Sequence, residues 1–233
     1  MHADENPTRT AGQQRSVFIR VHLWLLLLGS SLFAVLLTAG SPAVRAAASA
    51  APKLDRGKLL VASRDLRDPN FSETVILLIA YGPGGAMGVI VNRPSKMKLS
   101  TVLPSIKQLH RRHDTLYLGG PVAGDHVLLL VRAAKEPEDG VPVFEDVYAS
   151  SSLTVLRQQA QGKAAEDRLH AYAGHTGWAP GQLEAEVGRG DWYIVTADVA
   201  TVFSSHPNDV WEKLIQRVEG DWVSVPAPEP PGA

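Results

Sequence analysis

The chain has 233 residues, a formal net charge of −1 and no cysteine. This length fits one ordinary domain plus a leader, and the missing cysteines exclude disulfides, thiolate metal ligands, cysteine nucleophiles and a lipidated amino-terminal cysteine. Residues 47–233 carry 19 basic and 22 acidic residues, a net of −3, whereas a domain that grips nucleic acid usually has a clear basic excess. We therefore expect no direct nucleic-acid binding.

Residues 1–50 have the pattern of a secretory leader. No charged residue lies between Arg20 and Arg45, and the centre of this stretch, residues 23–37, is rich in leucine. Arginines precede it and a run of small residues follows, which is the order found in a signal peptide. An uncleaved membrane anchor through residues 21–44 is the alternative, since a spanning helix needs about 20 apolar residues. Both interpretations place the remaining chain in the periplasm or anchored at the inner membrane. The third interpretation is that the start codon is mis-assigned or that the protein is cytoplasmic.

From residue 57 to residue 148 the pattern is mostly that of strands. Strand-like runs over 58–63 and 74–81 precede a Gly/Pro loop, and a strand over 87–92 then completes a hairpin. Ser100 can cap a short helix to about residue 108, in which Pro104 must lie in the first turn or distort it. Further strands are predicted over residues 115–118, 126–132 and 143–148.

The second half of the chain is more helical. It predicts, in order, a helix over 151–161, a strand over 168–173, a helix from Pro180 to 187, a strand over 192–196 and a helix from Pro207 through 218. Irregular interleaving of strands and helices favours an α+β domain rather than a repeated βαβ array. We expect this domain to span residues 57–220, with a disordered, Pro-rich tail over 221–233.

Several segments, in order, resemble the AlgH/YqgE family. They are GKLLVA at 57–62 with DPNF at 68–71, GAMGVIVNRP at 85–94, GGPV at 119–122 and GHTGWAPGQLEAE at 174–186. Each motif is weak alone, but their shared order over about residues 57–218 is specific.

The resemblance implies a bifurcated mixed β-sheet, part of it closed into a small barrel, flanked by helices. The family has no established catalytic activity; its name comes from a role in regulating alginate production, and many members are described as transcriptional regulators. Ordinary members begin near the residue that matches Gly57, so the leader is a departure from the family pattern. His175 and Thr176 also stand where members more often have an aromatic residue and alanine.

The motifs contain six candidate ligand-binding residues. In the 174–186 segment, glycines allow close backbone approach, and a helix starting near Pro180 could offer N–H groups to an anion. The structural alternative is a tight strand-to-helix turn in which Trp178 anchors the core and the polar side chains form a solvated stripe. The candidates are Asn92, Arg93, His175, Trp178, Gln182 and Glu186.

No catalytic motif accompanies these candidates. Glu184 and Glu186 are two residues apart on a predicted helix, so they point to different sides and do not form an acid–base pair. G-x-S-x-G and H-E-x-x-H do not occur, and the glycines of 82–88 lack phosphate-loop spacing. His110 and His113 without a third ligand are weak evidence for a metal. We predict no catalytic residue, metal or cofactor.

The expected function is therefore a non-enzymatic binding or regulatory module, exported or membrane-anchored, for an unknown small ligand or protein partner. A cytoplasmic transcriptional regulator, with a mis-assigned or anchoring N-terminus, is the first alternative. A hydrolase or transferase built around His175, Trp178 and Glu184 is the second.

Overall fold

The computed structural model describes residues 53–161 and 168–223. The predicted leader over 1–50, with its candidate span at 21–44, lies outside these residues. In the part of the chain that is described, no helix is long and apolar enough to cross a membrane. Helix α5 (Val210–Val223) continues past residue 220, so the domain end predicted there falls inside the last helix.

Four antiparallel strands form one half of the sheet, in the order β10-β1-β2-β3. These strands are β1 (Lys58–Ala62), β2 (Val75–Gly82), β3 (Gly85–Ile90) and β10 (Trp192–Thr196). The first five residues of β2 are all buried, a continuous apolar run typical of a strand covered on both faces. This half therefore holds the centre of the larger hydrophobic core.

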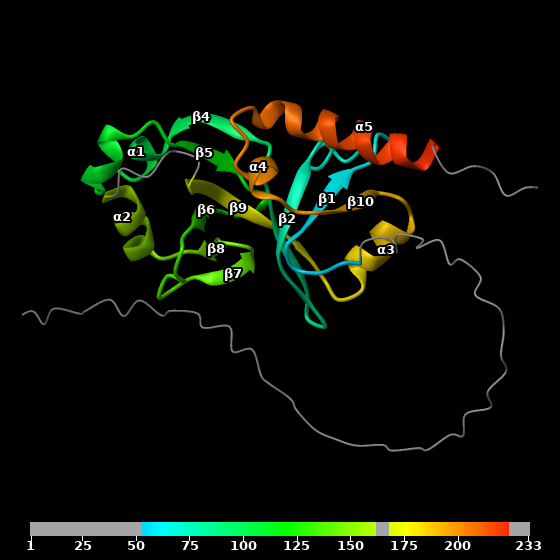
Figure 1. Cartoon of the computed structure of the whole chain (residues 1–233), viewed down its shortest axis with the longest axis horizontal. Coiled ribbons are helices and arrows are strands. Elements are labelled where there is room, and N and C mark those ends of the chain that lie inside the picture. The colour runs from blue at the N-terminus through cyan, green and yellow to red at the C-terminus, as the bar shows by residue number, and fades with distance from the viewer. Residues whose placement is uncertain (1–52, 162–167, 224–233) are drawn as a thin grey trace, which may run out of the picture. The chain divides into compact units, whose positions relative to one another are not determined.

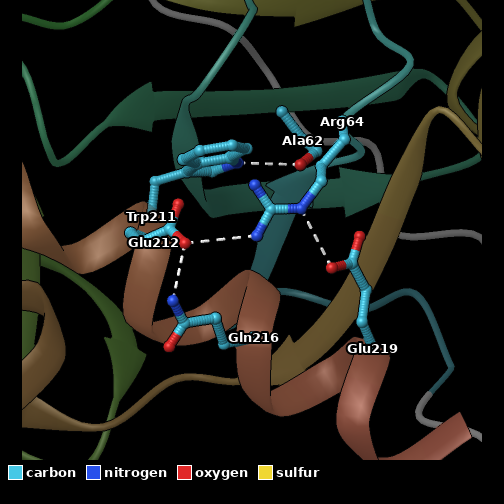
Figure 2. A network of polar contacts seen from close by, with 6 residues as sticks. All are labelled: Ala62, Arg64, Trp211, Glu212, Gln216 and Glu219. Atoms are coloured by element: carbon cyan, nitrogen blue, oxygen red, sulfur yellow. Dashed lines mark hydrogen bonds and ion pairs between the residues drawn. The ribbon is translucent and has the colours of Figure 1, made fainter. Parts of the chain in front are cut away.

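Helix α5 covers β1 and is fastened to it by polar contacts as well as by its apolar face. The Trp211 indole N–H donates to the Ala62 carbonyl oxygen at 2.8 Å. The Arg64 guanidinium lies over the Trp211 ring, with its central carbon 5.2 Å from the ring centroid. It also forms ion pairs with Glu212 at 3.2 Å and with Glu219 at 3.0 Å, two residues on the same side of α5 (Figure 2). Exposed ion pairs of this kind contribute little energy, so burial of the apolar face is the main stabilising term.

The second half of the sheet is joined to the first by the long strand β9. Its strands are β4 (Pro94–Lys98), β5 (Thr115–Leu118), β6 (Val122–Arg132), β7 (Val141–Phe144), β8 (Val147–Ser150) and β9 (Leu169–Trp178). β6 pairs antiparallel with one edge of β9, while β5 pairs parallel at Ala171–Ala173 and β3 pairs antiparallel at Thr176–Trp178. The sheet therefore branches along β9, at the point where its neighbouring strand changes from β5 to β3, as the family resemblance implies.

Glycines form this branch point because the backbones approach too closely for side chains. The Gly119 N–H donates to the Ala173 carbonyl at 2.8 Å, and the Gly119 carbonyl accepts from Ile90 N–H at 2.9 Å. A Cβ on Gly119 would lie 2.4 Å from the Gly174 carbonyl oxygen, and Gly174 itself has φ of 70°. The GGPV and GHTGW motifs thus build the fork of the sheet.

The small closed barrel implied by the resemblance is not confirmed. Within the described residues the path of paired strands runs from β10 to β7, and these two end strands do not pair with each other. All pairings except β5 with β9 are antiparallel. The fold is an open, mostly antiparallel sheet with a few helices.

Short helices pack around the sheet. The remaining helices are α1 (Leu99–Val102), η1 (Lys107–Arg111), α2 (Leu153–Gln161), α3 (Gln182–Gly188), α4 (Val199–Val202) and η3 (Pro207–Asp209). Helices α1 and α2 lie beside the second half of the sheet, and α3 lies beside its first half (Figure 1). α1, η1 and α2 pack on the face that carries Leu116 and Ala171. Tyr117 and Tyr172 face the other way, toward Phe203 and the larger core.

Several predicted elements have different bounds in the structure. The strand predicted over 143–148 is a hairpin of β7 and β8, turned at Glu145, whose φ is 44°. The helix predicted over 100–108 is two short pieces, α1 and η1, with Pro104 between them. The strand predicted over 168–173 continues through Gly174 to Trp178, because β6 pairs with it at His175 and β3 pairs with it at Thr176–Trp178.

Candidate functional site

Asn92 and Arg93 hold the loop that precedes β2. The Asn92 side chain is 7% exposed; its oxygen accepts from Val75 N–H at 2.8 Å and its amide donates to the Glu73 carbonyl at 2.9 Å. The Arg93 guanidinium donates to the carbonyl oxygens of Asn70 at 2.6 Å and Ser72 at 3.1 Å. Burial lowers the pKa of Arg93. These side chains order the loop from Asn70 to Val75, and a ligand-binding role for them stays a prediction.

Glu186 joins two buried tryptophans through its carboxylate. One oxygen accepts from the indole N–H of Trp178 at 2.8 Å and of Trp192 at 2.9 Å. The other accepts from the Gln182 amide at 2.9 Å, while the Gln182 oxygen accepts from Ala179 N–H at 3.1 Å. The expected solvated stripe is therefore a network that fixes the start of α3 against the core. Trp178, 7% exposed, is the core anchor that the structural alternative predicted.

An aromatic contact joins these two groups of residues. The Phe71 ring meets Trp192 edge-on at 6.0 Å, and Trp192 meets Trp178 edge-on at 6.3 Å. Edge-to-face pairs at this separation stabilise a core beyond their buried area. The DPNF, NRP and GHTGWAPGQLEAE motifs therefore form one packed structural unit.

His175 lies apart from these contacts. It occupies the middle of β9 opposite Val122, and burial, together with His126, lowers its pKa. The structure gives no hydrogen bond between His175 and Asn92 or Gln182 among the residues it describes. The next residue, Thr176, is 0% exposed, and its hydroxyl has no hydrogen-bond partner within the described part of the chain.

Glu184, the carboxylate of the hydrolase alternative, bonds to a different side chain. Its oxygen accepts from the Tyr81 hydroxyl at 2.7 Å, which lowers the pKa of Glu184. A carboxyl group that stays ionised is a poor general acid near neutral pH. No contact in the described chain brings it to His175 or Trp178, so the enzyme alternative gains no support from geometry.

Residues 53–161 and 168–220 contain no group of three or more His, Asp or Glu side chains placed to hold a metal ion. His110 lies on η1, and His113 lies in the segment after it.

A pocket of 360 Å³ opens on the face of the second half that carries Tyr117. This volume is at the lower end of the range for small-ligand sites. Its walls come from β4, β5, β9, the segment before β5 and the turn between α4 and η3. They comprise Pro94, His113, Asp114, Thr115, Tyr117, Leu169, His170, Phe203, Ser204, Ser205 and Pro207.

Aromatic rings form the floor of this pocket. His170 is stacked on Tyr117, with ring centroids 4.6 Å apart and planes at 22°, and Phe203 lies 4.8 Å away on a tilted plane. Tyr172 is fully buried beneath them, and its hydroxyl lies 3.3 Å from His170 Nδ1. Burial raises the pKa of both tyrosines, so the phenols stay neutral. Tyr117, His170 and Phe203 therefore form a continuous aromatic surface at the base of the pocket.

Polar groups border the aromatic floor. Asp114 is 8% exposed, and its carboxylate accepts two bonds from Arg112, the second at 2.8 Å. Ser204 and Ser205, in the turn before η3, also line the pocket; the Ser204 hydroxyl oxygen accepts from His206 N–H at 3.1 Å, and the Ser205 hydroxyl lies 3.0 Å from His206 Nδ1. The pocket thus combines an apolar stacking surface with a few hydrogen-bonding groups, the usual make-up of a small-ligand site.

Sequence reasoning missed this pocket because its residues share no motif. Tyr117, His170 and Phe203 come from three segments, and each is ordinary in its local pattern. The available signals were the basic character of the segment around His113 and Pro94, the last residue of the 85–94 motif.

Known proteins with similar sequences cover almost the whole described domain. The AlgH-like family model matches residues 59–223. A UPF0301 protein of Mycobacterium tuberculosis strain H37Rv is 35% identical over 173 residues, covering 73% of this chain and 85% of the relative. A UPF0301 protein of Rhodococcus opacus is 35% identical over 172 residues, covering 73% of this chain and 86% of the relative.

Solved structures agree with the sequence relatives. The AlgH protein from Pseudomonas aeruginosa, a UPF0301 protein solved in solution, superposes with a TM-score of 0.59 at 29% identity, covering 75% of this chain and 95% of that one. A crystal structure of a Corynebacterium diphtheriae protein gives a TM-score of 0.60 at 24% identity, over 77% and 91% of the two chains, and shows the shared fold. The chain therefore belongs to the AlgH-like family.

Proposed function

We propose that this protein is a non-enzymatic binding module and that its ligand occupies the pocket floored by Tyr117, His170 and Phe203. The observation that carries the proposal is the stacked aromatic floor in a 360 Å³ pocket. Preformed concave sites with an apolar wall and a few convergent polar groups are where small ligands bind. The motif residues Asn92, Arg93, Gln182 and Glu186 hold backbone and core groups, which supports binding elsewhere on the domain.

The binding experiment blocks the pocket at its rim. Ser205 is an exposed lining residue, so Ser205→Trp fills the opening with little effect on the core. Ala200→Trp, on the exposed side of α4, adds the same ring away from the pocket. Ligand-observed NMR with a library of small aromatic compounds should give hits that Ser205→Trp loses and Ala200→Trp keeps. Hits that persist equally in both variants would remove the pocket from the proposal.

We further propose that the domain acts outside the cytoplasm, exported or anchored by the leader. Support comes from the charge-free stretch between Arg20 and Arg45, preceded by arginines. A reporter enzyme that is active only outside the cytoplasm, fused after Ala233, should be active. Replacing two leucines of the stretch, Leu25 and Leu26, by Arg should abolish this activity. An inactive fusion that accumulates as intact protein would instead favour the cytoplasmic alternative.

A further inference from the structure

Basic residues gather in one segment of a domain that is acidic as a whole. From Thr74 to His113 there is no Asp or Glu, and this stretch contains six Lys or Arg residues. Two of these bind oxygen atoms of the protein itself: Arg93 holds loop carbonyls and Arg112 holds Asp114. The other four are exposed, and none forms an ion pair with the residues described by the structure; they are Lys96, Lys98, Lys107 and Arg111.

Lys98 is placed beside the pocket by strand pairing. It lies directly opposite Thr115 in the antiparallel pair of β4 and β5, and Pro94 lies opposite Tyr117, with a register shift between the two pairings. Side chains of directly opposed residues lie on the same face of a sheet, and Thr115, Pro94 and Tyr117 all line the pocket. Lys98 therefore extends from the pocket face of this strand pair, as an exposed residue next to those that line the pocket and not one of them.

Lys107 belongs to the other face. It lies on η1, whose Leu109 packs with Leu116 in the smaller core. Leu116 alternates with Thr115 and Tyr117 along β5, so it points away from the pocket. Lys98 and Lys107 thus carry the same charge in the same segment but on opposite sides of the sheet.

The pocket wall offers little negative charge to offset Lys98. Asp114 is the one acidic side chain among the described lining residues. Its carboxylate is bonded to the Arg112 guanidinium, and their side chains are only 5% and 10% exposed. This pair is close to neutral as a unit, so it does little to offset the charge of Lys98.

We propose that the pocket binds a small organic anion: a planar ring that lies against the aromatic floor and carries a phosphate or carboxylate group toward Lys98. The inference rests on the proposed function, because it names the ligand class for the same pocket. Stacking on the floor supplies the apolar contact, and a cation beside a partly enclosed site attracts a ligand anion more strongly than one in open solvent.

The test compares probes that carry the ring, the anion or both. Binding of phenyl phosphate, benzoate, benzyl alcohol and inorganic phosphate is measured by NMR titration of the full chain in a mild detergent. Phenyl phosphate or benzoate should bind more tightly than benzyl alcohol and inorganic phosphate. Lys98→Gln should weaken binding of the better aromatic anion about fivefold, the effect of losing one ion pair, and leave benzyl alcohol unchanged. Lys107→Gln, the matched charge control, should change neither.

Three results would contradict the inference, each in a different way. Equal binding of benzyl alcohol and both aromatic anions, unaffected by Lys98→Gln, would overturn the anion class and leave the binding pocket in place. No binding of any aromatic probe would overturn the pocket function as well. Equal losses from Lys98→Gln and Lys107→Gln, with a short DNA duplex binding more tightly than phenyl phosphate, would assign the basic segment to a polyanion.

Discussion

Thr176 buries a hydroxyl group that has no hydrogen-bond partner among the residues described by the structure. The residue is 0% exposed, and its Oγ1 has no partner in the described chain. Its cross-strand neighbour is Gly88, which has no side chain to offer one. An unsatisfied buried hydroxyl costs about 1–3 kcal/mol. Thr176→Val keeps the branched shape suited to a strand and removes the hydroxyl, so it should stabilise the protein by about 1–2 kcal/mol.

Thr74→Val is the matched control. Thr74 is also 0% exposed, but its hydroxyl donates to the Phe71 carbonyl at 2.7 Å. Removing that bond should destabilise the protein by about 1 kcal/mol. Urea denaturation of the full chain measures both changes as shifts in midpoint at constant slope. A Thr176→Val variant destabilised as much as Thr74→Val would refute the reasoning, because the hydroxyl would then have a bonding partner worth keeping.

Three further predictions concern the candidate site residues. Asn92→Ala should destabilise the protein by about 1–3 kcal/mol in the same assay, because it leaves the Val75 amide without its acceptor; a change near zero would contradict the buried bond. Glu186→Ala should cost about 2–3 kcal/mol and red-shift the tryptophan emission, since two indole N–H groups lose a charged acceptor; unchanged emission would mean that the indoles stay in place without it. Because burial lowers the pKa of His175 below 6.5, the unfolded state binds more protons and stability should fall as pH drops below that value. His175→Phe should flatten this slope, and an unchanged slope would place its origin at another residue.

Local patterns were enough to locate several elements. The strand predicted over 115–118 has the same bounds as β5, and that over 192–196 the same bounds as β10. The predicted last helix is confirmed by α5, whose buried Val210, Leu214 and Ile215 form the face packed on the sheet. Apolar periodicity works at these places because each segment buries one defined face.

Prediction failed where a turn or a strand end depended on distant backbone. Glu145 turns the β7–β8 hairpin at φ of 44°, a conformation that a non-glycine residue seldom signals in sequence. β9 continues through Gly174 because the residues before and after this glycine are paired: β6 pairs with Ala173 and His175, and β3 pairs with Thr176–Trp178. Strand pairing between remote segments overrides the local preference of glycine for turns.

For the candidate residues, too, local sequence patterns gave one part of the answer and contacts with remote segments gave the other. Their motifs marked Asn92, Trp178 and Glu186 as special, but whether each binds a ligand or the protein depends on partners elsewhere in the chain. Trp192 shares the Glu186 carboxylate with Trp178, a contact that spacing along the chain does not reveal.

By itself, the sequence determined the family, the α+β class, the absence of cysteine chemistry and the approximate positions of most strands and helices. These properties depend on composition and on patterns within a few residues of one another. Tertiary structure alone decided that the sheet stays open, that the motif residues hold one another, and that Tyr117, His170 and Phe203 meet in a pocket beside Lys98. The physical reason is that a pocket is made by side chains brought together through strand pairing and core packing, and these contacts join segments that no local pattern relates.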